Sequence, residues 1–319
     1  MPGVRSVDSE VLLSPDFAVA KDTHRIQFRS ALSDPAIKSL ARTLRARPDL
    51  ELRVYGRDGS IRDLTFLRAL PQVQTLHIEL DGLVSLAGIE ATADSLKSLV
   101  LGATKVALDL SPINDLPSIV RMYVEKHHRV VDLLAAWPTL RSLTLRSSRI
   151  RSIAPILNAP GLEALDLKLG ALSSLQGIGS LESLVYVELW GVRNLDSIEG
   201  LAEVPRLQEL YLDGLPRVEE VRALVDQQNL DRLTLRRMTG LSSFDDVIRI
   251  PNLHTVIVEE MPHIGLEEYA KLSQAPSLRE VELAPVVLSR LRAKGVEPML
   301  PGVADLGRHP ALRSSLSRQ

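Results

Sequence analysis

The chain has 319 residues, of which 45% are hydrophobic, 24% are charged and only 3% are aromatic. This composition excludes wholesale disorder, and the scarcity of rings favours a core of Leu, Val and Ile built in thin layers. The formal net charge is −2 and the chain contains no cysteine, which excludes disulfides, thiolate metal sites and thiol nucleophiles.

Charge is spread unevenly along the chain. Residues 1–48 and 285–319 carry net charges of +3 and +4, so residues 49–284 carry −9. Nucleic-acid binding needs a cationic surface, so the main body predicts none. No apolar run reaches the roughly 18 residues of a membrane span, and the N-terminus lacks a signal-peptide pattern. We therefore expect a cytoplasmic protein that binds no membrane; the ratio of 30 Arg to 8 Lys favours a bacterial source.

The first predicted element is a helix in an N-terminal cap that spans residues 1–48. Ser33 can cap the helix, and Pro35 lies in its first turn, where a missing N–H costs nothing. The apolar stripe of this helix consists of Ile37, Leu40, Ala41 and Leu44. Pro48 ends the cap before the first repeat.

Residues 49–284 contain eleven sequence repeats, each marked by an apolar frame residue. The intervals between frame residues are 21 to 25 residues. The frame residues are Leu50, Val73, Leu96, Ile119, Leu140, Leu162, Leu184, Leu207, Leu230, Leu253 and Leu278. Periods of this length predict a solenoid in which each repeat buries its apolar side chains against its neighbours.

Each repeat combines two periodicities. Apolar residues at +3 and +5 from the frame residue predict a strand, and only the first repeat, with Leu52 and Val54, is one residue shorter. The next apolar residues come every third position, which predicts 3₁₀ segments, with room for an α-helical turn at residues 266–272. Proline stands two residues before the frame residue in eight repeats, where a new strand should begin.

These units resemble the leucine-rich repeat superfamily, in particular the short units of about 22 residues in bacterial internalins. The cleanest stretch is residues 140–156, LRSLTLRSSRIRSIAPI. The resemblance implies an α/β solenoid, a horseshoe with a parallel sheet on its concave face and mostly 3₁₀ segments on its convex face. The family usually has Asn at +8, whereas here Asp81, Thr104 and Ser148 are the polar residues expected to replace it in part.

Beyond the repeats, residues 285–301 are predicted to form a C-terminal cap and residues 302–319 a flexible tail rich in Arg and Ser. The caps are needed because the end repeats would otherwise expose apolar side chains.

The candidate binding site lies on the concave face of the predicted sheet, to which positions +2, +4 and +6 point. Four of the five tyrosines and one of the two tryptophans occupy such positions. Aromatic rings and Arg dominate binding at protein interfaces. The predicted partner-binding residues are Tyr123, Arg146, Lys168, Tyr186, Glu188, Trp190, Glu209, Tyr211, Asp213, Arg232 and Arg236. Because aromatic residues also pack across strands, some of these rings can instead simply cover their neighbours.

No catalytic motif for nucleotides, zinc hydrolysis or a serine nucleophile is present in the sequence. The adjacent His127 and His128 point to different sides and are interpreted as loop residues rather than metal ligands. His77 and Glu79 share a strand face, as ionisable residues do on any solvated sheet. We therefore expect no enzyme activity, no metal and no cofactor.

The leading hypothesis is a protein-interaction module that holds a protein or peptide partner and acts as an adaptor, regulator or immunity-type antagonist. The alternative is a carbohydrate- or metabolite-binding protein or enzyme subunit, because aromatic rings also stack on sugars. A third hypothesis is a homo-oligomer that pairs through an edge strand. The sequence leaves the partner and the oligomeric state open.

Overall fold

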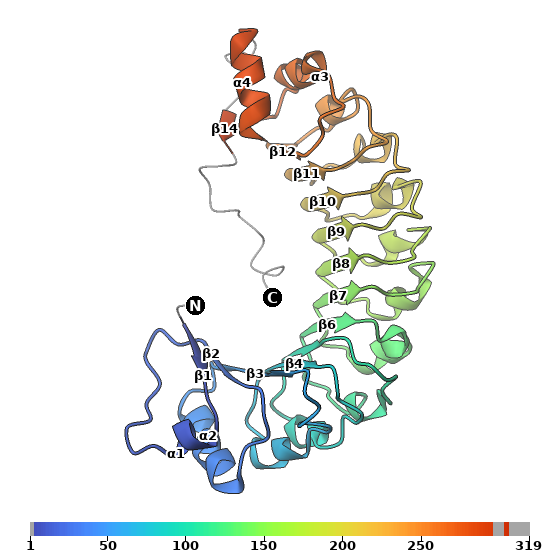
Figure 1. Ribbon diagram of the computed structural model, residues 1–319. Helices are drawn as coiled ribbons and strands as arrows, with labels where there is room; N and C mark the ends of the chain where they lie inside the picture. Colours follow the sequence, from blue (N-terminus) through green and yellow to red (C-terminus); the bar gives the residue numbers. More distant parts are fainter. Residues whose placement is uncertain (1–2, 296–302, 306–319) are drawn as a thin grey trace. The chain divides into compact units, whose positions relative to one another are not determined.

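The computed structural model describes residues 3–295 and 303–305. The chain divides into two compact units, residues 1–146 and residues 147–319. Each unit is a stack of coils in which a strand is followed by a short helical segment (Figure 1). In the described part of the chain, no helix has both the length and the apolar character needed to cross a membrane.

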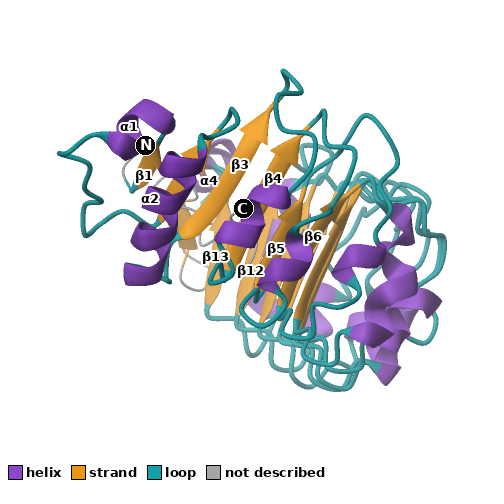
Figure 2. Cartoon of the chain, turned by 90° about the horizontal axis from the view of Figure 1, so that it is seen from below, coloured by secondary structure: helices purple, strands orange, loops and turns teal. Residues whose placement is uncertain are grey.

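The first unit contains seven strands in its described part, and each pairs in parallel with the next one along the chain. The strands are β1 (Val4–Ser6), β2 (Arg25–Phe28), β3 (Glu51–Gly56), β4 (Thr75–Leu80), β5 (Ser98–Leu101), β6 (Arg121–Glu125) and β7 (Ser142–Arg146). Between them lie α1 (Ser9–Leu13), α2 (Asp34–Ala46) and the 3₁₀ helices η1 (Thr65–Ala69), η2 (Ile89–Thr92), η3 (Ser111–Ile113) and η4 (His128–Ala136). Figure 2 shows α2 beside the strands of this unit, where it contacts α1 and η1.

The second unit repeats the pattern, and Figure 1 shows β8 to β12 side by side in chain order. Its strands are β8 (Ala164–Lys168), β9 (Tyr186–Trp190), β10 (Glu209–Asp213), β11 (Arg232–Arg236), β12 (Thr255–Glu259), β13 (Glu280–Leu283) and β14 (Val303–Asp305). Its helices are η5 (Ala154–Asn158), η6 (Ile178–Ser180), η7 (Glu199–Glu203), η8 (Arg222–Leu224), η9 (Val247–Arg249), α3 (Leu266–Lys271), η10 (Leu272–Gln274) and α4 (Pro285–Ala293).

The repeat frame predicts the strands accurately. β4 to β13 each begin two residues after a frame residue, and β3 begins one residue after Leu50, as expected from its shorter repeat. The side chains at +3 and +5, such as Leu210 and Leu212, are completely buried between coils. The predicted 3₁₀ segments are present, and the α-helical turn expected at residues 266–272 is α3. Each coil therefore buries its apolar residues only against the coils before and after it.

A left-handed residue follows the strand at +7 in seven consecutive repeats. These residues are Lys126, Ser147, Leu169, Gly191, Gly214, Arg237 and Glu260. The left-handed turn directs the backbone N–H toward the next coil, so that Leu169 N donates to Trp190 O at 2.7 Å and Gly191 N donates to Asp213 O at 2.7 Å. The strand ladder is thereby extended by one hydrogen bond at the corner of the first six of these coils.

Polar side chains one residue before the frame position replace the missing Asn ladder. Thr139 Oγ1 donates to the carbonyl oxygens of Pro117 and Ile119, both at 2.8 Å. Equivalent bonds to the preceding coil are made by Ser95, Asn229, Asn252 and Ser277. By contrast, the hydroxyl groups of Thr104 and Ser148, the expected substitutes at +8, form hydrogen bonds within their own coils. In this chain, the polar side chains that bond the preceding coil therefore lie before the strand, whereas the family's Asn lies after it.

The N-terminal segment holds more structure than the single helix expected there. Helix α2 covers the segment with the apolar stripe, and α1, β1 and β2 precede it. In β2, Ile26 pairs with Leu52 and Phe28 with Val54, which continues the buried columns by one further coil. At the C-terminus, β14 lies within the segment expected to be flexible and pairs with β13. The remaining residues of the predicted tail, and residues 296–301 of the predicted cap, lie outside the described residues.

Candidate functional site

The candidate site lies on the strand face of the second unit, which consists of the side chains of β8 to β13 that point away from the apolar core. Alternation of side chains places these residues at +2, +4 and +6 of each repeat. They are Ala164, Asp166, Lys168, Tyr186, Glu188, Trp190, Glu209, Tyr211, Asp213, Arg232, Thr234, Arg236, Thr255, Ile257, Glu259, Glu280 and Glu282.

The strand register brings nine of the eleven predicted site residues together on β8 to β11. Tyr186 lies beside Glu209, Glu188 beside Tyr211 and Trp190 beside Asp213, as their backbones pair between β9 and β10. The neighbouring strands add Lys168 on one side, and Arg232 and Arg236 on the other. The other two predicted residues, Tyr123 and Arg146, lie on β6 and β7 of the first unit.

Lys168 forms a buried ion-pair cluster at one side of this site. Its Nζ atom lies 3.1 Å from Glu188 Oε2 and 3.7 Å from Asp166 Oδ2, and the three side chains retain at most 10% of their exposure. Tyr186 donates its hydroxyl proton to the same Glu188 oxygen at 3.1 Å. The ammonium group also lies 5.9 Å from the centre of the Trp190 ring, within the range of a cation–π contact. Lys168 is thus an internal support of the face, held by two carboxylates.

Tyr186 is buried on the strand face, with only 6% of the residue accessible. Trp190 and Tyr211 are half-buried and keep part of each residue accessible. Tyr186 therefore packs among its neighbours, the second role that the sequence leaves open for these rings, and does not face solvent.

Asp213 anchors the opposite side of the site. Its carboxylate receives two parallel hydrogen bonds from Arg237, Nε to Oδ1 and Nη2 to Oδ2, both at 2.7 Å. Arg236 forms ion pairs with Asp213, Glu259 and Glu260, and it hydrogen-bonds the Tyr211 hydroxyl group. Bidentate Arg–carboxylate pairs are geometrically specific, so Arg237 fixes the Asp213 carboxylate in one orientation.

Desolvation raises the pKa of two further carboxylates of this face. Burial raises the pKa of Glu209 above its ordinary value, against the opposing effect of Arg232. Burial likewise raises the pKa of Glu259 and of the Tyr211 hydroxyl. Arg232 itself forms an ion pair with Glu282 at 3.5 Å. For Glu209 and Glu259, the nearby arginines therefore do not fully offset the loss of hydration of the carboxylate.

The first unit carries a second ionic cluster, centred on His77. Its ring nitrogens lie 3.1 Å from Glu51 Oε1 and 2.9 Å from Glu79 Oε1, and Arg25 and Arg53 pair with these two carboxylates. Burial lowers the pKa of His77, but the two carboxylates raise it more, and the net shift is upward. The hydrogen bond from His77 lowers the pKa of Glu79 to about 2. Both ring nitrogens are engaged with carboxylates, so the cluster is an ion network.

The predicted site residues Tyr123 and Arg146 contact each other in the first unit, and the histidine pair interpreted as a loop lies at the start of η4, with His128 as its first residue. Tyr123 is half-buried, burial raises its pKa to about 12, and it hydrogen-bonds Arg146, which also lies 3.5 Å from Glu125. His127 Nε2 contacts the carbonyl oxygen of Gly102 at 3.0 Å, and burial lowers its pKa. Among the described residues, no group of three His, Asp or Glu side chains is arranged to hold a metal ion.

No family model matches the sequence. An internalin from Listeria monocytogenes, InlF, is similar to 97% of this chain over 91% of its own length, at 16% sequence identity and a TM-score of 0.56. The chain has a leucine-rich repeat fold.

Two further leucine-rich repeat structures are similar at lower TM-scores. Internalin C2 from Listeria monocytogenes matches 60% of this chain and 82% of its own, at 22% identity and a TM-score of 0.49. A leucine-rich repeat protein from Leptospira interrogans matches 94% of both chains, at 15% identity and a TM-score of 0.40. The similarity to InlF and the eleven sequence repeats together show the leucine-rich repeat fold.

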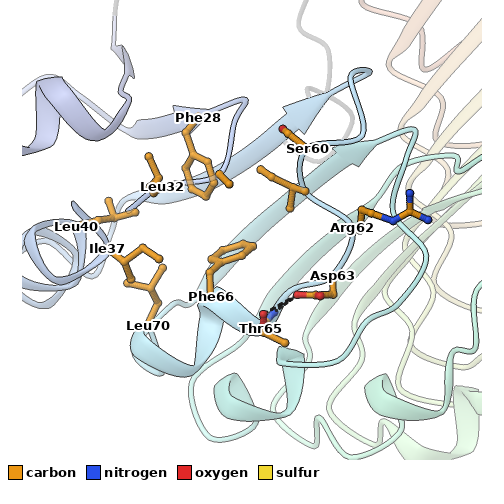
Figure 3. Close-up of a pocket in the computed structure, with 12 residues that line it drawn as sticks. Phe28, Leu32, Ile37, Leu40, Ser60, Arg62, Asp63, Thr65, Phe66 and Leu70 are labelled. Atoms are coloured by element: carbon orange, nitrogen blue, oxygen red, sulfur yellow. Dashed lines mark hydrogen bonds between the residues drawn. The ribbon is translucent and has the colours of Figure 1, made fainter. Parts of the chain in front are cut away.

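The leucine-rich repeats of the first unit also border an apolar cavity that the sequence did not reveal. The cavity measures about 270 Å³ and lies between α2 and η1 (Figure 3). Phe28 and Phe66 meet edge-on in its wall with ring centres 5.5 Å apart, and Leu32 and Ile37 face them (Figure 3). Asp63 at its rim accepts hydrogen bonds from Thr65. The cavity arises where an α-helix packs beside the thinner 3₁₀ segment of the next coil.

Sequence reasoning missed two further residues of the second unit. Arg237 and Glu260 stand at +7, just beyond the strands, and the left-handed backbone there brings both into the Asp213 and Arg236 network. The sequence does place the charged Arg237 directly after Arg236, a predicted site residue. The left-handed turn that directs the Arg237 side chain toward Asp213 is visible only in the structure.

Proposed function

We propose that the protein is a non-enzymatic interaction module that binds a protein or peptide partner on the strand face of its second unit. Trp190 and Tyr211 form the centre of the proposed contact. A role as adaptor, regulator or immunity-type antagonist is consistent with such a surface. The proposed setting is the bacterial cytoplasm, since a chain without cysteine needs no oxidising compartment.

The observation that carries this proposal is a pair of accessible rings held in fixed positions. The chain has only two tryptophans and five tyrosines, and Trp190 and Tyr211 lie on adjacent strands with part of each ring exposed. Lys168 supports Trp190 from the side, and Arg236 holds Tyr211. Rings that are already ordered lose little conformational entropy on binding, which is what anchors of protein interfaces require.

The proposal assigns no catalytic step to the strand face. Lys168, Arg232 and Arg236 are each engaged in ion pairs with carboxylates of the same face, so these charged groups act on one another. A sugar or metabolite on the two rings is the competing function, and a glycan array in which Trp190→Ala abolishes binding, with no protein partner found, would favour it.

Site-directed photocrosslinking tests the proposal. The photoreactive residue benzoylphenylalanine replaces Trp190 in one variant and Glu220, an exposed residue outside the sheet, in a matched control. We expect position 190 to crosslink to one defined protein in cell extract and position 220 to leave that protein unmodified. The double substitution Trp190→Ala with Tyr211→Ala should leave the fold intact and cost about 2–4 kcal/mol of binding free energy. Identical crosslinks from both positions would refute the site.

A further inference from the structure

The strand face of the second unit carries a large excess of negative charge. It holds seven acidic residues and three basic ones. All three basic side chains are already engaged: Lys168 with Glu188, Arg232 with Glu282, and Arg236 with Glu259. Four of the seven acidic residues, Asp166, Glu188, Asp213 and Glu282, are buried. A partner therefore meets the accessible carboxylates of Glu209, Glu259 and Glu280.

Two of these carboxylates stand without a cation of their own. Within the described part of the chain, neither Glu209 nor Glu280 has an ion-pair partner within 4.0 Å. Glu209 is also half-buried between Tyr186 and Arg232, and burial raises its pKa. A cation that binds a partly buried carboxylate gains more electrostatic free energy than one that binds an exposed carboxylate. The protein surroundings screen the attraction between the two charges less than bulk water does.

The accessible rings favour the same type of ligand. Trp190 and Tyr211 lie on the two strands that also carry Glu209, whereas the other two carboxylates of these strands, Glu188 and Asp213, are buried. The faces of Trp and Tyr rings attract cations, and a planar guanidinium group stacks on them while it hydrogen-bonds a carboxylate. The two rings and Glu209 thus offer both parts of an arginine-binding surface.

The edge of the face next to Trp190 and Asp213 is lined by two glycines. Gly191 and Gly214 occupy the left-handed position directly beyond Trp190 and Asp213, with φ angles of 64° and 63°. Neither contributes a side chain, although the side chain of Leu169 lies over Gly191. The neighbouring Leu169 is 40% exposed and provides an apolar contact beside the ring.

We propose that the partner presents an arginine- or lysine-rich segment, which binds across β9 and β10 with one guanidinium group over Tyr211 and against Glu209 and a second basic side chain over Trp190. This inference rests on the proposed function, because it names the chemistry of the partner that the same face holds. Charge complementarity is the reason for choosing a basic occupant over an acidic or purely apolar one.

Tryptophan fluorescence gives a direct test, because only one of the two tryptophans belongs to this face. Trp190 is half-buried in the second unit, whereas Trp137 in the first unit is 1% exposed and donates a hydrogen bond to Ile113 O. Octa-arginine is titrated against the full chain, with octa-glutamate as the probe of opposite charge. We expect octa-arginine to change the fluorescence of the protein and octa-glutamate to leave it unchanged. The Trp190→Phe variant, in which only Trp137 emits, should show no change with either peptide.

Matched charge variants separate a site from general attraction. Glu209→Gln with Glu280→Gln should weaken octa-arginine binding about five- to tenfold. The control Glu219→Gln with Glu220→Gln removes the same charge from an exposed segment outside the sheet and should weaken binding less than about twofold. Raising the salt concentration from about 0.1 M to about 1 M shortens the Debye length from about 10 Å to 3 Å and should weaken binding to the unchanged chain.

The basic-partner inference is overturned if the two double variants lose affinity equally, or if octa-arginine leaves the Trp190 signal unchanged. Crosslinking from position 190 distinguishes this failure from that of the proposed function. A defined crosslinked partner together with a silent octa-arginine titration leaves the proposed function standing and removes only the basic chemistry. If position 190 yields no specific crosslink either, the proposed function fails as well.

Discussion

Replacing Lys168 with Met tests whether the ion cluster beneath Trp190 stabilises the second unit. The substitution keeps the length and apolar stem of the side chain but removes the charge that Asp166 and Glu188 share. These two carboxylates retain 4% and 8% of their exposure, so water cannot replace the ammonium group. The variant therefore removes the ammonium group from two buried carboxylates on adjacent strands.

Two quantities set the expected loss of stability: the attraction between Lys168 and its carboxylates, and the free-energy cost of protonating a carboxylate that has lost its cation. At 3.1 Å and an effective dielectric constant of about 20, the attraction between Lys168 and Glu188 is about 5 kcal/mol before desolvation is subtracted. Breaking such buried pairs costs about 3–5 kcal/mol. A stranded carboxylate can instead take up a proton, which for a carboxyl group of ordinary acidity costs roughly 4 kcal/mol at pH 7 and roughly 1 kcal/mol at pH 5. We therefore expect Lys168→Met to lower the free energy of unfolding by about 3 kcal/mol at pH 7 and by about 1 kcal/mol at pH 5.

Urea unfolding at both pH values measures this difference. The matched control is Lys271→Met, because Lys271 also lies between two carboxylates, 2.7 Å from Asp245 and 2.8 Å from Glu268, but its side chain is 31% exposed. Solvent screens such pairs, and the control should change stability far less. Adding Glu188→Gln to Lys168→Met should restore part of the loss. The reasoning is refuted if the two single lysine variants are equally stable, or if the effect of Lys168→Met is the same at pH 5 and pH 7.

Three further outcomes are expected from urea unfolding. Because the pKa of His77 is raised above 6.5, the stabilisation from this residue is fully present below about pH 6.5 and is lost as pH rises through the raised pKa. His77→Gln should therefore lower stability more at pH 6 than at pH 9, and a pH-independent difference would contradict the network. Thr139→Ala should cost about 1 kcal/mol and Thr139→Ser much less, since only Ala removes the bonds to the preceding coil; equal losses would show that the ladder contributes nothing. Gly191→Ala should cost more than the roughly 1 kcal/mol of Gly214→Ala, because both need a left-handed backbone but only the Cβ at position 191 would meet Leu169, at 2.7 Å. The reverse order would show that Leu169 moves freely.

Much of the fold could be predicted because the repeat is a local property that recurs. The frame residues, the alternation at +3 and +5 and the spacing of three fixed the positions of β3 to β13 and of the 3₁₀ segments. The polar side chains that bond the preceding coil could also have been predicted from the sequence, because ten of the eleven residues that precede a frame residue are polar. The coil built on β2 was missed because helix α2 lengthens the interval between β2 and β3 and interrupts the pattern.

The candidate site was predicted as a set of positions but not as a set of interactions. Period-two alternation correctly placed Tyr186, Trp190 and Tyr211 on the face opposite the core, because the direction of a strand side chain depends only on its own backbone. Accessibility and ion pairing depend on what the neighbouring coils place alongside, one repeat earlier and one repeat later. Only the tertiary structure could therefore show that Tyr186 is covered, that Lys168 is buried between two carboxylates, and that the left-handed turn at +7 brings Arg237 to Asp213.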